Sequence, residues 1–131
     1  MSRQKCIALG SLLAGTAVVL GAFGAHALKD RLEAGGYVAT WETAVQYHMW
    51  HALAILLVAA LTRGASEGDE SRGTGAAPWA FLLGVLAFSG SLYGLALGGP
   101  RWLGPVTPLG GVALIVGWIL VLVRSLRSAA R

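Results

Sequence analysis

The three histidines of the chain, His26, His48 and His51, are the side chains in this sequence best suited to chemistry. Histidine changes its charge near neutral pH when unperturbed, and its neutral ring also binds metals. All three lie near the junction of the first two long apolar stretches, and Glu42 lies between the first histidine and the other two. Titratable residues at membrane depth are expensive, so their cluster marks a candidate site. The pattern identifies a place and leaves its chemistry open.

Metal binding and catalysis each lack a complete pattern around this cluster. His48 and His51 are three residues apart, which suits one helix face, but no H-E-x-x-H arrangement accompanies them. Cys6 is the single cysteine and lies at the other end of the first apolar stretch, so it forms no intramolecular disulfide and cannot join the histidines. The sequence holds no Ser-His-Asp set and no Gly-rich phosphate loop followed by lysine. We therefore predict no catalytic residue and no required cofactor, and we leave the identity of any metal open.

The elements that must position these residues are four apolar stretches that are long enough to cross a membrane. Their approximate bounds are 6–28, 43–62, 79–98 and 106–123, and none of them contains Asp, Glu, Lys or Arg. A helix rises about 1.5 Å per residue and the hydrocarbon core is about 30 Å thick, so about 20 apolar residues span it. Charged residues make up 12% of the chain, which argues against a soluble domain, where about 25% is typical. The sequence predicts one transmembrane domain over residues 1–131, an all-α four-helix membrane bundle.

A secretory signal peptide is the alternative interpretation of the first stretch. Arg3 and Lys5 give a basic start, and Ala25-His26-Ala27 fits a small-x-small cleavage site. The apolar run is longer than the usual h-region of about 7 to 15 residues, which favours a transmembrane helix. We therefore retain four spans.

The distribution of Lys and Arg predicts the orientation. With four spans, the N-terminus, the second loop and the C-terminus share one side of the membrane and hold seven of the ten basic residues. The positive-inside rule therefore places both termini in the cytoplasm. The stretch 64–78 is rich in Gly, Ser and acidic residues and is typical of a flexible cytoplasmic linker. The basic surplus suits anionic lipid headgroups, and no basic face with interleaved aromatics indicates nucleic-acid binding.

Capping residues predict where the helices end. Residues 29–33 are expected to continue the first helix beyond the membrane surface until Gly35 and Gly36 stop it. Thr40 is expected to cap the second long helix, and Thr107 followed by proline is expected to begin the fourth. The aromatic residues near helix ends, expected as interfacial anchors, are Trp41, Tyr47, Trp79 and Trp102.

Small residues are expected to decide how the helices pack, because close approach supplies much of the attraction between helices in lipid. The first and third spans carry most of them and are predicted to form the centre of the bundle. The predicted packing residues are Gly10, Ala14, Ala17, Gly21, Gly90, Gly94, Gly98, Gly110 and Gly111. A neighbouring face of the first span carries Ser11, Gly15, Ala22 and His26. The small-residue surface of these helices exceeds what one four-helix bundle can bury. We therefore expect a homo-oligomer or a larger membrane complex, with membrane lipid as the other partner.

The polar residues of the spans are predicted to form one layer toward the outer half of the membrane. Its members are His26, Glu42, Gln46, His48, His51, Ser89, Ser91 and Tyr93. Helical rotation places the last two histidines on one side of their helix and Glu42 and Gln46 on another, so this helix is expected to lie buried between neighbours. His26 and His48 are expected to share a partner, with His51 nearer the midplane.

Three interpretations of this layer remain. Hydrogen bonds between helices, from neutral imidazoles to backbone carbonyls or to Ser89, Ser91 and Tyr93, are the one that we favour. A site for a metal, a haem or a quinone headgroup is the second. A proton relay is the third, and it is weakened because Glu42 is the one carboxylate near membrane depth.

Four motifs taken together resemble a known bacterial family. They are 21–29 (GAFGAHALK), 41–48 (WETAVQYH) followed by 51–53 (HAL), 88–93 (FSGSLY), and 107–111 (TPLGG) followed by 117–118 (GW). In combination they are similar to domain-of-unknown-function family 423, which also resembles small eukaryotic transmembrane proteins. The resemblance implies a small four-span protein of the bacterial inner membrane with no assigned catalytic residue. We therefore expect a non-enzymatic membrane component, with binding or transport of a small molecule, ion or cofactor at the histidine layer as the alternative.

Overall fold

Five helices make up the described part of the chain. The structure is a computed structural model, and it describes residues 1–62 and 74–129. The helices are α1 (Arg3–Ala25), α2 (Lys29–Gly35), α3 (Val38–Leu61), α4 (Ala77–Ala96) and α5 (Leu103–Ala129). All except α2 are long and apolar enough to cross a membrane. The predicted all-α fold with four spans is therefore confirmed, and most of the predicted linker 64–78 lies outside the described residues.

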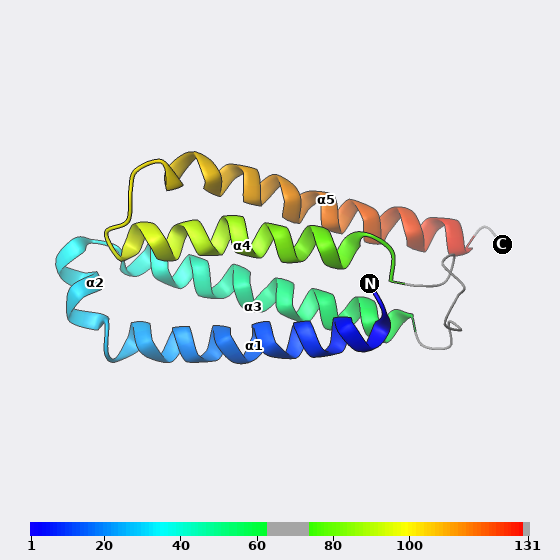
Figure 1. Cartoon of the computed structure of the whole chain (residues 1–131), viewed down its shortest axis with the longest axis horizontal. Coiled ribbons are helices and arrows are strands. Elements are labelled where there is room, and N and C mark those ends of the chain that lie inside the picture. The colour runs from blue at the N-terminus through cyan, green and yellow to red at the C-terminus, as the bar shows by residue number, and fades with distance from the viewer. Residues whose placement is uncertain (63–73, 130–131) are drawn as a thin grey trace.

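The four long helices lie antiparallel and follow one another in a row. α3 packs between α1 and α4, and α4 packs between α3 and α5, whereas α1 makes almost no contact with α4 or α5. Figure 1 shows the same order, with both termini at one end and α2 at the other. The prediction that the first and third spans form the centre is confirmed for the third span, α4, and wrong for the first, because α3 lies beside α4 and α1 lies at the edge of the row.

The connection between α1 and α3 differs from the predicted continuous helix. α1 ends at Ala25 with His26 as its C-cap, and α2 begins after a turn. Gly36 ends α2 in a left-handed conformation with φ 73°, which glycine adopts without steric cost. α3 begins at Val38, two residues after Gly36, and Tyr37 is its N-cap. The prediction that Thr40 caps this helix is therefore wrong.

The start of the last span also differs from its prediction. α5 begins at Leu103, so Thr107 and Pro108 lie inside the helix and do not begin it. The Thr107 hydroxyl lies 3.4 Å from the carbonyl of Leu103 and 2.7 Å from the hydroxyl of Ser91 on α4. Thr107 therefore links two helices, because its side chain has partners one turn back and on the neighbouring helix.

Glycines allow α4 and α5 to approach each other closely. A Cβ on Gly110 would overlap the backbone nitrogen of Phe88, and one on Gly117 would overlap the ring of Phe81. Gly10 has the same role between α1 and α3, where an added Cβ would lie 2.7 Å from Leu56 Cγ. Each of these glycines allows close contact between helix backbones, the main attraction available in lipid.

The other predicted packing residues divide into two groups. Ala17 is completely buried, Gly94 packs against Leu103, and Ala14, Gly21 and Gly111 make ordinary contacts. Gly90 faces open space, and Gly98 lies in the turn after α4 with φ 82°. The prediction that Gly90 and Gly98 pack between helices is therefore wrong. A small residue in the sequence does not reveal whether its side of the helix faces a neighbouring helix.

Gly110→Ala should destabilise the protein, because the added methyl group meets backbone atoms of α4 that cannot move aside. We expect the free energy of unfolding to fall by about 1–3 kcal/mol. Gly111→Ala is the matched control, since its Cβ would lie 3.6 Å from the Phe88 ring, an ordinary contact. Unfolding in detergent micelles, followed by circular dichroism, measures both variants, and equal stability of the two would contradict this account of the α4–α5 contact.

Candidate functional site

The predicted polar layer divides into a buried group and an exposed group. His48, His51, Ser89 and Ser91 are buried with 6% or less of their surface exposed, and Tyr93 is half-buried beside them. The exposed residues are His26, Glu42 and Gln46. The burial of the first group follows from the position of α3 and α4 at the centre of the row, where polar side chains have neighbours on both sides.

His48 connects three helices. Its Nε2 lies 3.4 Å from Thr16 Oγ1 on α1, and its Nδ1 lies 3.4 Å from the Tyr93 hydroxyl on α4. Thr16 already donates its own hydroxyl proton to the carbonyl of Leu13 at 2.9 Å. Thr16 therefore accepts from His48, so the proton of a neutral imidazole lies on Nε2 and Tyr93 donates to Nδ1. Both bonds are at the long end of the hydrogen-bond range.

His51 makes shorter contacts and connects α3 with α5. The indole N–H of Trp118 donates to its Nε2 at 3.2 Å, and its Nδ1 lies 2.8 Å from the carbonyl of Tyr47, one turn back. Because Nε2 accepts, Nδ1 must be the nitrogen that donates to the carbonyl. The two histidines of α3 therefore hold opposite tautomers, each set by its neighbours.

Aromatic rings surround His51. Its ring centroid lies 5.9 Å from that of Tyr47, 5.6 Å from that of Phe81 and 6.1 Å from that of Trp118. Trp118 is 44% exposed, and its ring also packs against that of the buried Phe81, with the centroids 5.2 Å apart. This tryptophan therefore supplies a hydrogen bond between helices.

The two serines of α4 do not contact the histidines. Ser91 bonds to Thr107 on α5 and to the carbonyl of Phe88. Ser89 is completely buried, and its hydroxyl has no hydrogen-bond partner among the described residues. Of the three partners that were expected on this helix, only Tyr93 bonds to a histidine.

His26 lies apart from the buried histidines. It caps the end of α1, its side chain is exposed, and it forms no side-chain hydrogen bond within residues 1–62 and 74–129. His48 lies level with Thr16, which is ten residues away from His26 and hence about 15 Å along α1. The expected partnership of His26 with His48 is therefore wrong, since α3 begins ten residues before His48 and places this histidine beside the middle of α1, away from the end that His26 caps.

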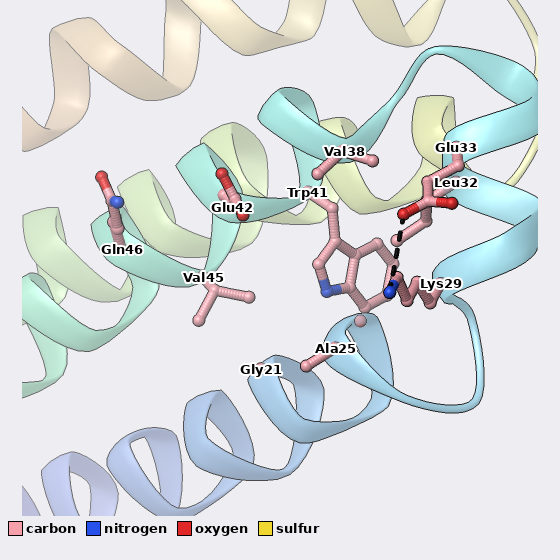
Figure 2. Close-up of a pocket in the computed structure, with 11 residues that line it drawn as sticks. Gly21, Ala25, Lys29, Leu32, Glu33, Val38, Trp41, Glu42, Val45 and Gln46 are labelled. Atoms are coloured by element: carbon pink, nitrogen blue, oxygen red, sulfur yellow. Dashed lines mark ion pairs between the residues drawn. The ribbon is translucent and has the colours of Figure 1, made fainter.

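Glu42 and Gln46 lie together in a different place. Both line a cavity between α1, α2 and α3, which Figure 2 shows with the indole of Trp41 at its wall. Trp41 is 3% exposed and donates its N–H to the carbonyl of Leu20 at 3.0 Å. It is therefore a buried contact between α1 and α3, and the expectation that it anchors the helix at the membrane interface is wrong.

The chemistry of the buried group is that of interhelical hydrogen bonding. All four ring nitrogens of His48 and His51 have protein partners. Within the described ranges, no three residues among His, Cys, Asp and Glu lie close enough to hold a metal ion. A group arranged in this way connects α1, α4 and α5 through α3.

Sequence reasoning missed two members of this network, Thr16 and Thr107. A signal existed for Thr16, which is the single threonine of the first apolar stretch 6–28. Thr107 is followed by proline, a pair that is typical of a helix start. The sequence therefore gives no sign that Thr107 lies inside the helix.

Comparisons with known proteins give a consistent result. The model of a family described as "Protein of unknown function (DUF423)" matches residues 20–111. A UPF0382 membrane protein of Staphylococcus epidermidis is 43% identical over 94% of this chain and 96% of its own length. The UPF0382 membrane protein YwdK of Bacillus subtilis is 44% identical over 92% of this chain and 95% of its own length. No solved structure matches the chain.

The opposite tautomers of His48 and His51 can be measured by ¹⁵N NMR of the protein in micelles at neutral pH. We expect a protonated Nε2 in His48 and a protonated Nδ1 in His51, because their partners differ in donor capacity. Thr16→Val should remove the acceptor of His48, leave His51 unchanged as an internal control, and lower the free energy of unfolding by about 0.5–1 kcal/mol. The same tautomer in both rings would show that the hydrogen-bond assignment is wrong.

Proposed function

This chain belongs to the DUF423 family of membrane proteins, and from that premise we propose that it is a non-enzymatic component of the bacterial cytoplasmic membrane that associates with further copies of itself. The observation that carries the proposal is the outward face of α1. Ser11, Gly15 and Ala22 are exposed there, and nothing lies within 4 Å of the position that a Gly15 Cβ would occupy.

The burial of the histidines supports the non-enzymatic part of the proposal. A catalytic imidazole needs a ring nitrogen that can reach a substrate. In this protein every ring nitrogen of the two buried histidines is bonded to another protein group, three of the four on neighbouring helices. For the same reason the alternative function, binding or transport at the histidine layer, gains no support.

The two outer helices of the row differ in the faces that they turn away from the bundle. α5 exposes large aliphatic side chains, among them Leu109, Val112, Ile115, Ile119 and Leu122, each more than half exposed. Such a surface suits fluid lipid chains. α1 also exposes large aliphatic side chains, Leu12, Val18 and Val19, but its small residues lie beside them and allow another helix backbone to approach closely, which is how transmembrane helices associate.

Polar groups on the same side of α1 favour a protein partner over lipid. Ser11 and His26 are exposed there and have no side-chain hydrogen bond in the described part of the chain. Polar side chains that face hydrocarbon are costly, and a facing helix can supply their partners. A two-fold axis along the membrane normal would bring the α1 helices of two copies together at Gly15 in a self-complementary contact.

The proposed orientation places both termini in the cytoplasm, because seven of the ten Lys and Arg residues belong to the termini and the second loop. Green fluorescent protein fused to the C-terminus should therefore fluoresce, whereas alkaline phosphatase fused at the same position should be inactive. Active phosphatase would reverse the proposed orientation.

Self-association can be tested with a substitution that fills the open face. Native mass spectrometry in mild detergent should show a dimer or a larger oligomer of the natural chain. Gly15→Leu should convert it to monomer, because the added side chain keeps the α1 backbones apart. Gly90→Leu is the matched control, since this glycine of α4 also faces open space. A natural chain that is strictly monomeric, or equal effects of the two substitutions, would rule out an interface at α1.

A further inference from the structure

The helices α1, α2 and α3 surround an open cavity of about 590 Å³ at the end of the bundle opposite the termini (Figures 1 and 2). We propose that this cavity binds a long-chain primary amine, whose ammonium group pairs with Glu42 and whose alkyl chain lies between α1 and α3. None of Ser11, Gly15 and Ala22 lines the cavity, so the proposal is independent of self-association.

Glu42 supplies the charge that selects a cation. It lines the cavity, its side chain is exposed, and it forms no ion pair or side-chain hydrogen bond within the described residues. Glu33, the other carboxylate of the wall, is paired with Lys29 at 3.9 Å. Glu42 lies four residues into α3, about 6 Å from its first residue, where an unpaired charge near hydrocarbon is costly. A cation from outside the chain would remove that cost.

Gln46 adds a hydrogen-bond acceptor one turn deeper. It lines the same cavity and is also exposed, although α3 crosses the membrane at this level. Its Cα lies about 6 Å along the helix from that of Glu42, so a single ammonium group can reach both side chains. A primary ammonium has three N–H donors, which match a carboxylate and an amide oxygen. This pairing favours a primary amine over a quaternary one, which has no N–H donor.

Trp41 gives the cavity a rigid aromatic wall. Its N–H is already bonded to Leu20, and its ring packs against Tyr93 with the centroids 4.8 Å apart. Gly24 permits this position, because an added Cβ would overlap the indole ring. The apolar part of the wall includes Gly21, Ala25, Val38 and Val45, which suits an alkyl chain.

The order of charges along the cavity favours a simple amine over a phospholipid. Lys29 lies on the short helix α2, whereas Glu42 lies four residues into the long helix α3, and Val45 follows it along the lining. In phosphatidylethanolamine the phosphate lies between the acyl chains and the ammonium group. With its chains directed inward, this lipid would place its phosphate beside Glu42. A long-chain amine places the ammonium group directly on the chain, which matches the depth of the free carboxylate.

The test is native mass spectrometry of the full chain in maltoside micelles titrated with dodecylamine. Glu42→Gln should weaken binding about tenfold, because a charged hydrogen-bonded pair is replaced by a neutral one. Asp30→Asn removes the same charge from α2 at a residue that does not line the cavity, and it should bind as the natural chain does. Equal affinity of the natural chain and Glu42→Gln, or an equal loss in Asp30→Asn, would overturn the proposal.

A second pair of variants tests the cavity without removing a charge. Ala25→Leu should fill the space between α1 and α3 and weaken dodecylamine binding, whereas Ala27→Leu, outside the lining, should not. Parallel titrations with phosphatidylethanolamine and dodecyl sulfate distinguish the possible ligands, and we expect weaker binding of the first and none of the second. Binding of dodecyl sulfate as tight as that of dodecylamine, or dodecylamine binding unaffected by Ala25→Leu, would contradict the proposed site.

Discussion

The need of polar side chains for partners inside a membrane determines how this protein is arranged. α3 carries two histidines at membrane depth, and water is absent there to satisfy their ring nitrogens. The helix can cross the membrane only if its neighbours supply those partners. α1 supplies Thr16, α4 supplies Tyr93 and α5 supplies the indole of Trp118. The central position of α3 and its high fraction of buried residues follow from this requirement.

Close packing of the helices at glycine residues also stabilises the bundle, and these contacts differ between the two edges of the row. Between α4 and α5 the glycines at 84, 110 and 117 each face a side chain or backbone segment of the other helix. At the other edge of the row, Gly10 brings α1 onto α3, while Gly15 on the same helix faces open space. Glycine therefore allows close packing inside the bundle at position 10, whereas at position 15 it lies on the outer surface. The outer faces of α1 and α5 both carry large aliphatic side chains, and on α1 Leu12, Val18 and Val19 lie one turn from Gly15.

The sequence predicted the spans well and their mutual arrangement poorly, for physical reasons. Absence of charge over about 20 residues is a property of each segment alone, so the four spans could be recognised separately. Helical rotation likewise placed His48 and His51 on one side of α3, and both are buried. Which residues of α1 and α3 lie beside each other depends on the turn at residues 26–28 and on α2. The hydrophobic periodicity of the sequence specifies neither of these. This is why the sequence predicts His26 beside His48, although His48 lies beside the middle of α1 and His26 caps its end.

The end of the molecule at α2 shows how those unpredicted elements create an imbalance of charge. α2 carries two cations, and both are engaged: Lys29 pairs with Glu33, and Arg31 donates to the carbonyl of Leu97 at 2.6 Å. Trp41 is turned toward α1 by its bond to Leu20, which leaves the next residue, Glu42, on the side of the cavity. Among the described residues, that carboxylate has no positive partner, although two cations lie on the short helix beside it. The two cations of α2 are engaged by other groups, and Glu42 is left without a cation among the described residues. This carboxylate at the membrane boundary is therefore suited to a positive charge from outside the chain.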